Sequence, residues 1–149
     1  MDAKIKKGCI LKFSPEMRAV YRALDANCNR VREGFRVAED VARFMLNDAS
    51  LLTRLKKLRH AVTLAEKSLF QSSQLRRLSR NVQKDLGKGS REKSEKTRSS
   101  VEDLLKANLK RSQEALRSLE EFTKLIGHPA SVRFKKIRYE CYRIEESLS

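Results

Sequence analysis

The second half of this 149-residue chain repeats the first. Residues 26–40 align with 107–121 at an offset of 81, and residues 54–69 align with 133–148 at an offset of 79. Thirteen of the 31 aligned positions are identical, whereas composition alone gives roughly two or three. The first block contains Ala-Asn-x-x-Arg-x-x-Glu in both copies. Because the offset changes only between the blocks, we expect the repeating unit to be a helical hairpin whose turn varies in length.

Local signals place the helices of the first copy. Ser14 and Pro15 have the residue types of an N-cap and a first helical position, so we expect a helix from there to about Leu46. Residues 47–50 form a turn with capping groups, and a second helix follows to about Leu69.

Similar signals place the helices of the second copy. Ser99-x-x-Glu102 has the pattern of a capping box and predicts the start of a third helix. Gly127, suited to a left-handed C-terminal cap, ends it, and a fourth helix runs from about Pro129 to the end.

These signals predict one all-α domain, residues 1–149, made of hairpins 14–70 and 99–149 joined by a basic connection at 71–98. Apolar residues recur every three or four positions along both long helices. The predicted fold is therefore an antiparallel four-helix bundle from two duplicated αα-hairpins, with pseudo-two-fold symmetry. The two predicted core stripes are Leu24, Cys28, Val31, Phe35, Ala38, Ala42 and Met45, and Leu105, Leu109, Ser112, Leu116, Leu119, Thr123 and Ile126.

The cysteines and the apolar runs indicate a cytoplasmic protein. Cys9, Cys28 and Cys141 are too few and too scattered for a disulfide framework. Cys28 aligns with Leu109 and Cys141 with Val62, so both are expected in the core. No apolar run is long enough to span a bilayer, so no membrane partner is expected.

The net charge of +15 is unevenly distributed. Residues 1–13 carry +3 and the connection 71–98 carries +6. Such an excess favours a phosphate-bearing partner, in a nucleotide, a nucleic acid or a small metabolite, and it equally suits a solubilising surface.

The repeated polar motif contains the main candidate site. On a helical projection its Asn and Arg, at Asn27 and Arg30 and again at Asn108 and Arg111, fall in a small or apolar arc beside the core stripe. An unpaired Arg in a buried arc is costly, so these side chains need partners. The projection places the solvated outer face at Asp25, Arg32, Arg36, Glu39 and Arg43.

Two interpretations of this motif remain open. In a purely structural one, Arg30–Glu33 and Arg111–Glu114 pair within their helices, and the two Asn side chains bond across the symmetry axis. In a functional one, the two Arg and two Asn converge on a bound anion and a polar ring.

The connection contains a second candidate. In Arg80-Asn81-x-x-x-Asp85-Leu86-Gly87-Lys88-Gly89, glycines beside a lysine could let backbone amides approach phosphate while Asp85 binds Mg²⁺. The segment lacks the P-loop pattern, and a solvated linker is the more common explanation.

Two segments of the chain resemble a known helical domain. They are Tyr21-Arg22-Ala23-Leu24-Asp25-Ala26-Asn27-Cys28-Asn29-Arg30-Val31-Arg32-Glu33-Gly34-Phe35 and Ala107-Asn108-Leu109-Lys110-Arg111-Ser112-Gln113-Glu114-Ala115-Leu116. It is the hydroxymethylpyrimidine-phosphate kinase domain usually fused ahead of bacterial thiamine-phosphate synthase. The resemblance covers about residues 16–148. It implies ATP, Mg²⁺ and a phosphorylated pyrimidine, which the kinase converts to the diphosphate for thiamine biosynthesis.

The resemblance also implies roles for individual residues. Catalytic roles fall to Arg30, Arg111, Glu33 and Glu114, substrate binding to Asn27, Asn108 and Asn81, cofactor binding to Gly87, Lys88 and Gly89, and metal binding to Asp85.

The sequence departs from the family in two respects. Asn81 occupies the position of the family's first loop Asp, and Lys88 replaces a usual Thr. Losing a carboxylate predicts weaker metal binding. No synthase barrel follows, so we expect a freestanding copy, acting alone, as a homodimer or with a thiamine-phosphate synthase.

The alternative hypothesis is a non-enzymatic basic bundle. It would bind nucleic acid through residues 71–98 and 1–13, or a protein partner through the apolar arc of the first helix. Only charge supports the nucleic-acid version, because the sequence shows no recognition helix or aromatic platform.

Overall fold

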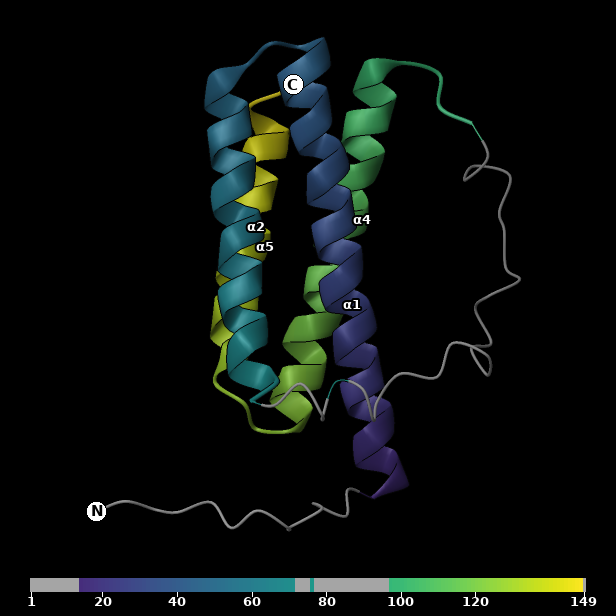
Figure 1. Cartoon of the computed structure of the whole chain (residues 1–149), viewed down its shortest axis with the longest axis vertical. Coiled ribbons are helices and arrows are strands. Elements are labelled where there is room, and N and C mark those ends of the chain that lie inside the picture. The colour runs from purple at the N-terminus through teal and green to yellow at the C-terminus, as the bar shows by residue number, and fades with distance from the viewer. Residues whose placement is uncertain (1–13, 72–75, 77–96, 149) are drawn as a thin grey trace.

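The computed structural model describes residues 14–71, 76 and 97–148. Across these residues the chain is helical and contains no strand. The helices are α1 (Pro15–Asp40), the π-helical turn η1 (Val41–Met45), α2 (Ala49–Leu69), α4 (Val101–Leu125) and α5 (Ala130–Glu146). α1 packs against α2 and α4, and α5 packs against the same two helices. Neighbouring helices run in opposite directions (Figure 1), which confirms the predicted all-α, antiparallel four-helix arrangement.

Three helix ends follow directly from local sequence. Ser14 Oγ accepts a hydrogen bond from Met17 N at 3.2 Å, which makes Ser14 the N-cap of α1. Asp48 caps α2 in the same way. Gly127 has a φ of +64°, the left-handed conformation predicted for the residue that ends α4.

The capping box of α4 lies one residue later than predicted. Ser100 Oγ accepts from Asp103 N, and Asp103 Oδ2 accepts from Ser99 N, both at 3.0 Å. The expected box, Ser99 with Glu102, is therefore wrong. The pattern occurs in two successive registers, and in the observed one Glu102 instead pairs with Lys106 on the next turn.

The core contains the two predicted stripes except at one end. The first stripe is buried from Leu24 on α1 to Ala42 on η1, but Met45 at the end of η1 is 56% exposed. The reason is η1, in which Leu46 N bonds to Val41 O five residues back, so that the spacing of a regular α-helix is lost. On α4 the stripe is buried from Leu105 to Thr123, and Ile126 is half-buried.

The predicted solvated face of α1 is wrong at two acidic residues. Asp25 and Glu39 are buried, because basic residues from elsewhere in the chain cover them. Glu39 Oε1 lies 2.5 Å from Arg59 Nε on α2, and Asp25 Oδ1 lies 3.5 Å from Arg76 Nε. Arg32 is partly buried and pairs with Glu66. Helical periodicity cannot distinguish a solvated carboxylate from one buried beside an arginine.

The second hairpin contains a matching ion pair. Glu120 on α4 is buried, and its Oε2 lies 2.7 Å from Arg138 Nη2 on α5. Glu120 and Arg138 are the residues that align with Glu39 and Arg59. The shared contact agrees with the predicted duplication, which remains an inference from sequence. No described helix has the length and apolar character needed to cross a membrane.

Candidate functional site

The candidate site is built on the close contact between α1 and α4. Gly34 faces Ser112, and a Cβ on Gly34 would lie 2.2 Å from Ser112 Oγ and 2.7 Å from Asn108 O. Ser112 Oγ donates to Val31 O at 3.2 Å, which joins the two helices through the buried interface. Glycine is therefore required at position 34 for this approach.

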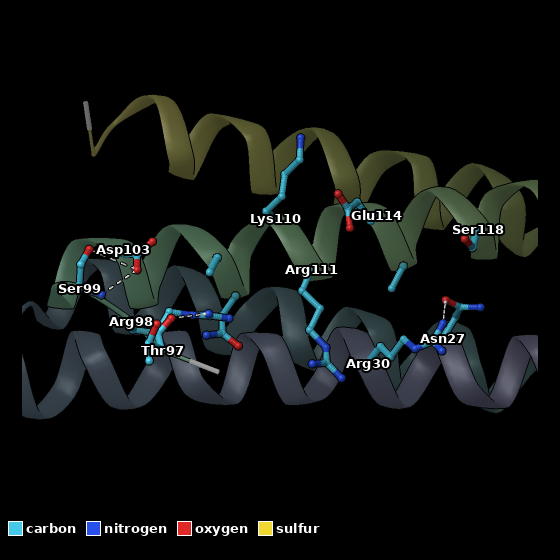
Figure 2. Close-up of a pocket in the computed structure, with 13 residues that line it drawn as sticks. Asn27, Arg30, Thr97, Arg98, Ser99, Asp103, Lys110, Arg111, Glu114 and Ser118 are labelled. Atoms are coloured by element: carbon cyan, nitrogen blue, oxygen red, sulfur yellow. Dashed lines mark hydrogen bonds between the residues drawn. The ribbon is translucent and has the colours of Figure 1, made fainter. Parts of the chain in front are cut away.

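A groove of about 1080 Å³ is lined by residues of both helices and of the segment before α4. Figure 2 shows Arg30 and Asn27 on α1 close to one another, with Arg111 extending from α4 toward α1. Both copies of the repeated motif thus contribute an Asn and an Arg to one groove, although they are 81 residues apart. The lining residues are Asn27, Arg30, Thr97, Arg98, Ser99, Asp103, Ala107, Asn108, Lys110, Arg111, Glu114, Ala115 and Ser118.

The two asparagines adopt the same conformation. Asn27 Nδ2 donates to Ala23 O at 2.8 Å, and Asn108 Nδ2 donates to Leu104 O at 2.9 Å. The bond between the two asparagines in the structural interpretation is therefore absent, because each amide satisfies a carbonyl one turn earlier in its own helix. Since the donor end of each amide is used in this way, its Oδ1 is the atom best placed to accept a hydrogen bond from a ligand.

The two arginines are exposed, contrary to the prediction of a buried arc. Arg30 Nη1 donates to Asn27 Oδ1 at 3.3 Å, and Arg111 Nη2 lies 3.5 Å from Glu33 Oε2 on the opposite helix. The predicted pairs within one helix, Arg30–Glu33 and Arg111–Glu114, are absent among the described ion pairs. Long arginine side chains can carry their charge out of an apolar arc, so the backbone position did not determine burial.

The groove has an excess of positive charge. Four cationic residues line it, against the carboxylates of Asp103 and Glu114. Asp103 serves in the cap of α4, whereas Glu114 is exposed and forms no ion pair with the described residues. An arrangement of this kind attracts anions while leaving one carboxylate for a metal or a polar ligand.

Sequence reasoning missed part of this groove. Lys110 and the segment Thr97–Ser99 line it, but neither belongs to the repeated motif. Lys110 lies one turn after Ala107 and one turn before Glu114, so helical spacing could have identified it. The contribution of Thr97–Ser99 depends on how the chain enters α4, for which the sequence has no signal.

The predicted loop residues Asn81, Asp85, Gly87, Lys88 and Gly89 lie outside the described residues. Within the described part of the chain, no group of three or more His, Cys, Asp or Glu residues could hold a metal ion. A divalent cation here would therefore depend on one or two carboxylates together with ligand phosphates, a mode of binding typical of Mg²⁺.

The two described cysteines do not act as nucleophiles. Cys28 and Cys141 are fully buried, and burial raises the pKa of each thiol to about 12. Both are therefore protonated at neutral pH, as expected of core residues.

The fold and the groove together define a class of protein: a small four-helix bundle with a cation-lined polar groove between two of its helices. Within that class, the chain belongs to the ThiD2 family, whose model matches residues 22–147. This result confirms the resemblance found in the two repeated segments.

Several similar proteins are named thiamine-phosphate synthases. The chain is 42% identical over 129 residues to the one from Rhodopirellula baltica, which covers 85% of this chain and 33% of the relative. It is 38% identical over 131 residues to the one from Nostoc punctiforme, which covers 88% of this chain and 36% of the relative. The chain thus spans about a third of the length of these relatives. No solved structure matches it.

Proposed function

We propose that this chain is a kinase of thiamine biosynthesis that transfers the γ-phosphoryl group of ATP to hydroxymethylpyrimidine phosphate. The observation that carries the proposal is the convergence of Asn27, Arg30, Asn108 and Arg111 on one groove. Membership of the ThiD2 family and similarity to thiamine-phosphate synthases support the assignment to thiamine biosynthesis.

The main obstacle in this reaction is electrostatic. The acceptor is already an anionic phosphate, so its attack on the γ-phosphorus needs no protein base. Two anions must instead be brought into contact, and charge neutralisation is the chief requirement of phosphoryl transfer. Arg30, Lys110 and Arg111 are exposed cations in the groove and can supply it.

The asparagines suit the ring of the substrate. In each, Nδ2 bonds to the backbone. Asn108 Oδ1 accepts no hydrogen bond from the described residues, and Asn27 Oδ1 accepts one, from Arg30 at 3.3 Å, which leaves it a second lone pair. An aminopyrimidine carries an exocyclic amino group that donates hydrogen bonds, and adenine carries one as well. The groove therefore offers one acceptor for each ring and cations for their phosphates.

Mg²⁺ would accompany ATP and neutralise further phosphate charge. Glu114 is the described carboxylate that could contact it, and Asp85 remains the predicted second ligand. Glu33, which pairs with Arg111 but does not line the groove, would position that arginine and not touch the substrate.

The test is an assay with ATP, Mg²⁺ and hydroxymethylpyrimidine phosphate, in which the diphosphate is measured by mass spectrometry. We expect Arg30→Ala and Arg111→Ala to lower kcat/KM by roughly ten- to a hundredfold, since a hydrogen bond to a charged group contributes about 1.5–3 kcal/mol. Arg18→Ala is the matched control, because Arg18 is exposed on α1 and lies outside the groove.

Absence of diphosphate, under conditions in which an authentic kinase forms it, would contradict the proposal. An equal loss in the Arg18→Ala variant would instead show that general positive charge, and not the groove, is responsible.

A further inference from the structure

The second block of the repeat contains a basic motif that the groove does not use. Residues 54–59 have the sequence Arg-Leu-Lys-Lys-Leu-Arg, and residues 133–138 have the sequence Arg-Phe-Lys-Lys-Ile-Arg. The first copy lies on α2 and the second on α5. None of these residues lines the groove between α1 and α4.

The structure separates this motif into an inner and an outer part. Its apolar positions are buried in the core, and its last Arg, Arg59 or Arg138, pairs with a buried glutamate. The two lysine pairs, Lys56–Lys57 and Lys135–Lys136, are exposed. Stability explains the inner part of the motif, but it does not account for the lysines.

The two lysine pairs lie on adjacent, antiparallel helices. α2 packs against α5 (Figure 1), and Arg54 Nη1 donates to Ser147 Oγ at 3.2 Å. This bond places Lys57 opposite Ile144, eight residues beyond Lys136. At 1.5 Å per residue the two lysine pairs are separated by about 12 Å along the helices.

The charge of this surface is not neutralised by its own helices. The two helices carry four acidic residues: Glu66 is buried against Arg32, Glu140 pairs with Arg143, Glu145 accepts from Gln113, and Glu146 is exposed at the end of α5. One exposed carboxylate, without an ion pair to the described residues, thus stands against the six cations of this surface. No ion pair within the described residues involves the exposed cations of this surface. We call this surface the α2–α5 basic face, and its cations are Lys56, Lys57, Lys67, Arg133, Lys135 and Lys136.

An exposed aromatic ring lies between the two lysine pairs along α5 and α2. Tyr139 is 48% exposed, and the Arg138 guanidinium lies 5.1 Å from the centre of its ring. Tyr142 packs edge-on against Tyr139, with the ring centres 5.7 Å apart. The Tyr139 ring is therefore supported by neighbours on its own helix while part of it remains open to solvent.

We propose that the α2–α5 basic face binds single-stranded nucleic acid. A polymer of regularly spaced phosphates can contact both lysine pairs at once, and a base can stack on Tyr139 between them. The proposal concerns a different surface from the kinase groove and does not depend on it.

The residue types disfavour two other occupants. Lysine is depleted at protein–protein interfaces, whereas it dominates this face. A membrane surface would require a continuous apolar strip to insert, whereas the large apolar side chains that α2 and α5 expose are Leu64, Val132 and Tyr139, against the six cations of this face.

The test uses fluorescence anisotropy of the full chain with a labelled 20-nucleotide oligouridine. We expect the logarithm of the association constant to fall linearly with the logarithm of the salt concentration, with a slope of roughly 0.7 for each phosphate contact. Lys56→Glu/Lys57→Glu and Lys135→Glu/Lys136→Glu should each weaken binding at least tenfold, and Tyr139→Ala severalfold. Circular dichroism checks that each variant is folded.

The matched control is Arg18→Glu/Arg43→Glu, which changes the net charge equally but alters two exposed arginines of α1 and η1 that lie outside both this face and the groove. This variant should retain most of the affinity. An equal loss of affinity in this control would show that binding depends only on the net positive charge of the protein, and it would overturn the proposal. Unchanged binding in the lysine-pair variants would overturn it as well. Tighter binding to phosphatidylserine vesicles than to the oligonucleotide would identify a membrane surface instead and would also overturn it.

Discussion

Gly34 of α1 packs so closely against Ser112 of α4 that a Cβ at position 34 would lie 2.2 Å from Ser112 Oγ. That Cβ would also lie 2.7 Å from a backbone oxygen, Asn108 O. The side chain could rotate away, but the carbonyl belongs to a regular helix and cannot. The distance between α1 and α4, and with it the shape of the groove, depends on the missing methyl group.

Gly34→Ala should therefore destabilise the protein. Alanine favours a helix by about 1 kcal/mol over glycine, but overpacking a close interface costs about 1–3 kcal/mol and would push the helices apart. We expect a net loss of stability in denaturant unfolding together with weaker binding of pyrimidine phosphate. A Gly34→Ala variant as stable as the wild type would show that α1 and α4 can separate freely.

Gly127→Ala is the companion variant for this experiment. A Cβ at Gly127 meets nothing within 4 Å, but its φ of +64° disfavours any other residue. We expect it to lose about 1 kcal/mol of stability while ligand binding stays unchanged, because the groove is not involved.

Recognition of the ring amino group should depend on the two asparagines. Replacing the amino group of the pyrimidine phosphate by a carbonyl turns a donor toward Oδ1 of Asn27 or Asn108 into an acceptor. We expect binding to weaken by roughly two- to tenfold, because a lost hydrogen bond costs about 0.5–1.5 kcal/mol. Isothermal calorimetry measures this effect without phosphoryl transfer, and equal affinities for both ligands would contradict it.

The buried ion pair between Glu120 and Arg138 should make stability depend on acid pH. Burial raises the pKa of Glu120, but hydrogen bonds from Arg138 and Lys124 outweigh this effect and hold the pKa below its ordinary value. The stabilisation is thus complete above the unfolded pKa of about 4.3 and is lost as the pH falls through the lower folded value. Unfolding monitored between pH 7 and pH 3 should show this loss.

Glu120→Gln should be less stable at pH 7 and should have a shallower acid dependence than the wild type. Glu121→Gln is the matched control, since Glu121 is adjacent and half-exposed and its ion pairs are screened by water. We expect that control to change stability by less than about 0.5 kcal/mol. An acid profile in Glu120→Gln that equals the wild-type profile would rule out this pair as its source.

The buried cysteines should resist alkylation in the folded protein. Burial raises the pKa of Cys28 and of Cys141 from 9.0 to about 12, so at pH 8 neither is a thiolate. Iodoacetamide should modify both only after unfolding, and peptide mass spectrometry separates them from Cys9. The contribution of the two protonated thiols to the free energy of unfolding is complete below pH 9 and is lost as the pH rises toward 12. Rapid modification of either cysteine in the native state would show that its helix opens.

Some features could be predicted because their causes are local. Ser14 caps α1 and Gly127 ends α4 through contacts within a few residues. The core stripes follow from helical spacing, and the prediction was wrong at Met45, where a π-helical turn changes that spacing. The box at Ser99 was misplaced because the next residue has an equally suitable pattern.

Polar partners were harder to predict because they come from other helices. Asp25 and Glu39 were placed in solvent from their positions on α1, yet each is covered by an arginine distant in sequence. Arg30 and Arg111 were expected to be buried, but their long side chains reach solvent. A helical projection gives the direction of a side chain from its own axis and contains no information about the neighbouring helix.

By itself, the sequence determined that this chain is a helical bundle with one polar motif in each half, because repeats, caps and spacing are properties of the chain alone. Only the tertiary structure decided that the two motifs share a groove, with Glu33 of one paired to Arg111 of the other. The physical reason is that α1 packs against α4 at Gly34 and Ser112, and this contact between residues 78 positions apart depends on how closely two helix surfaces fit.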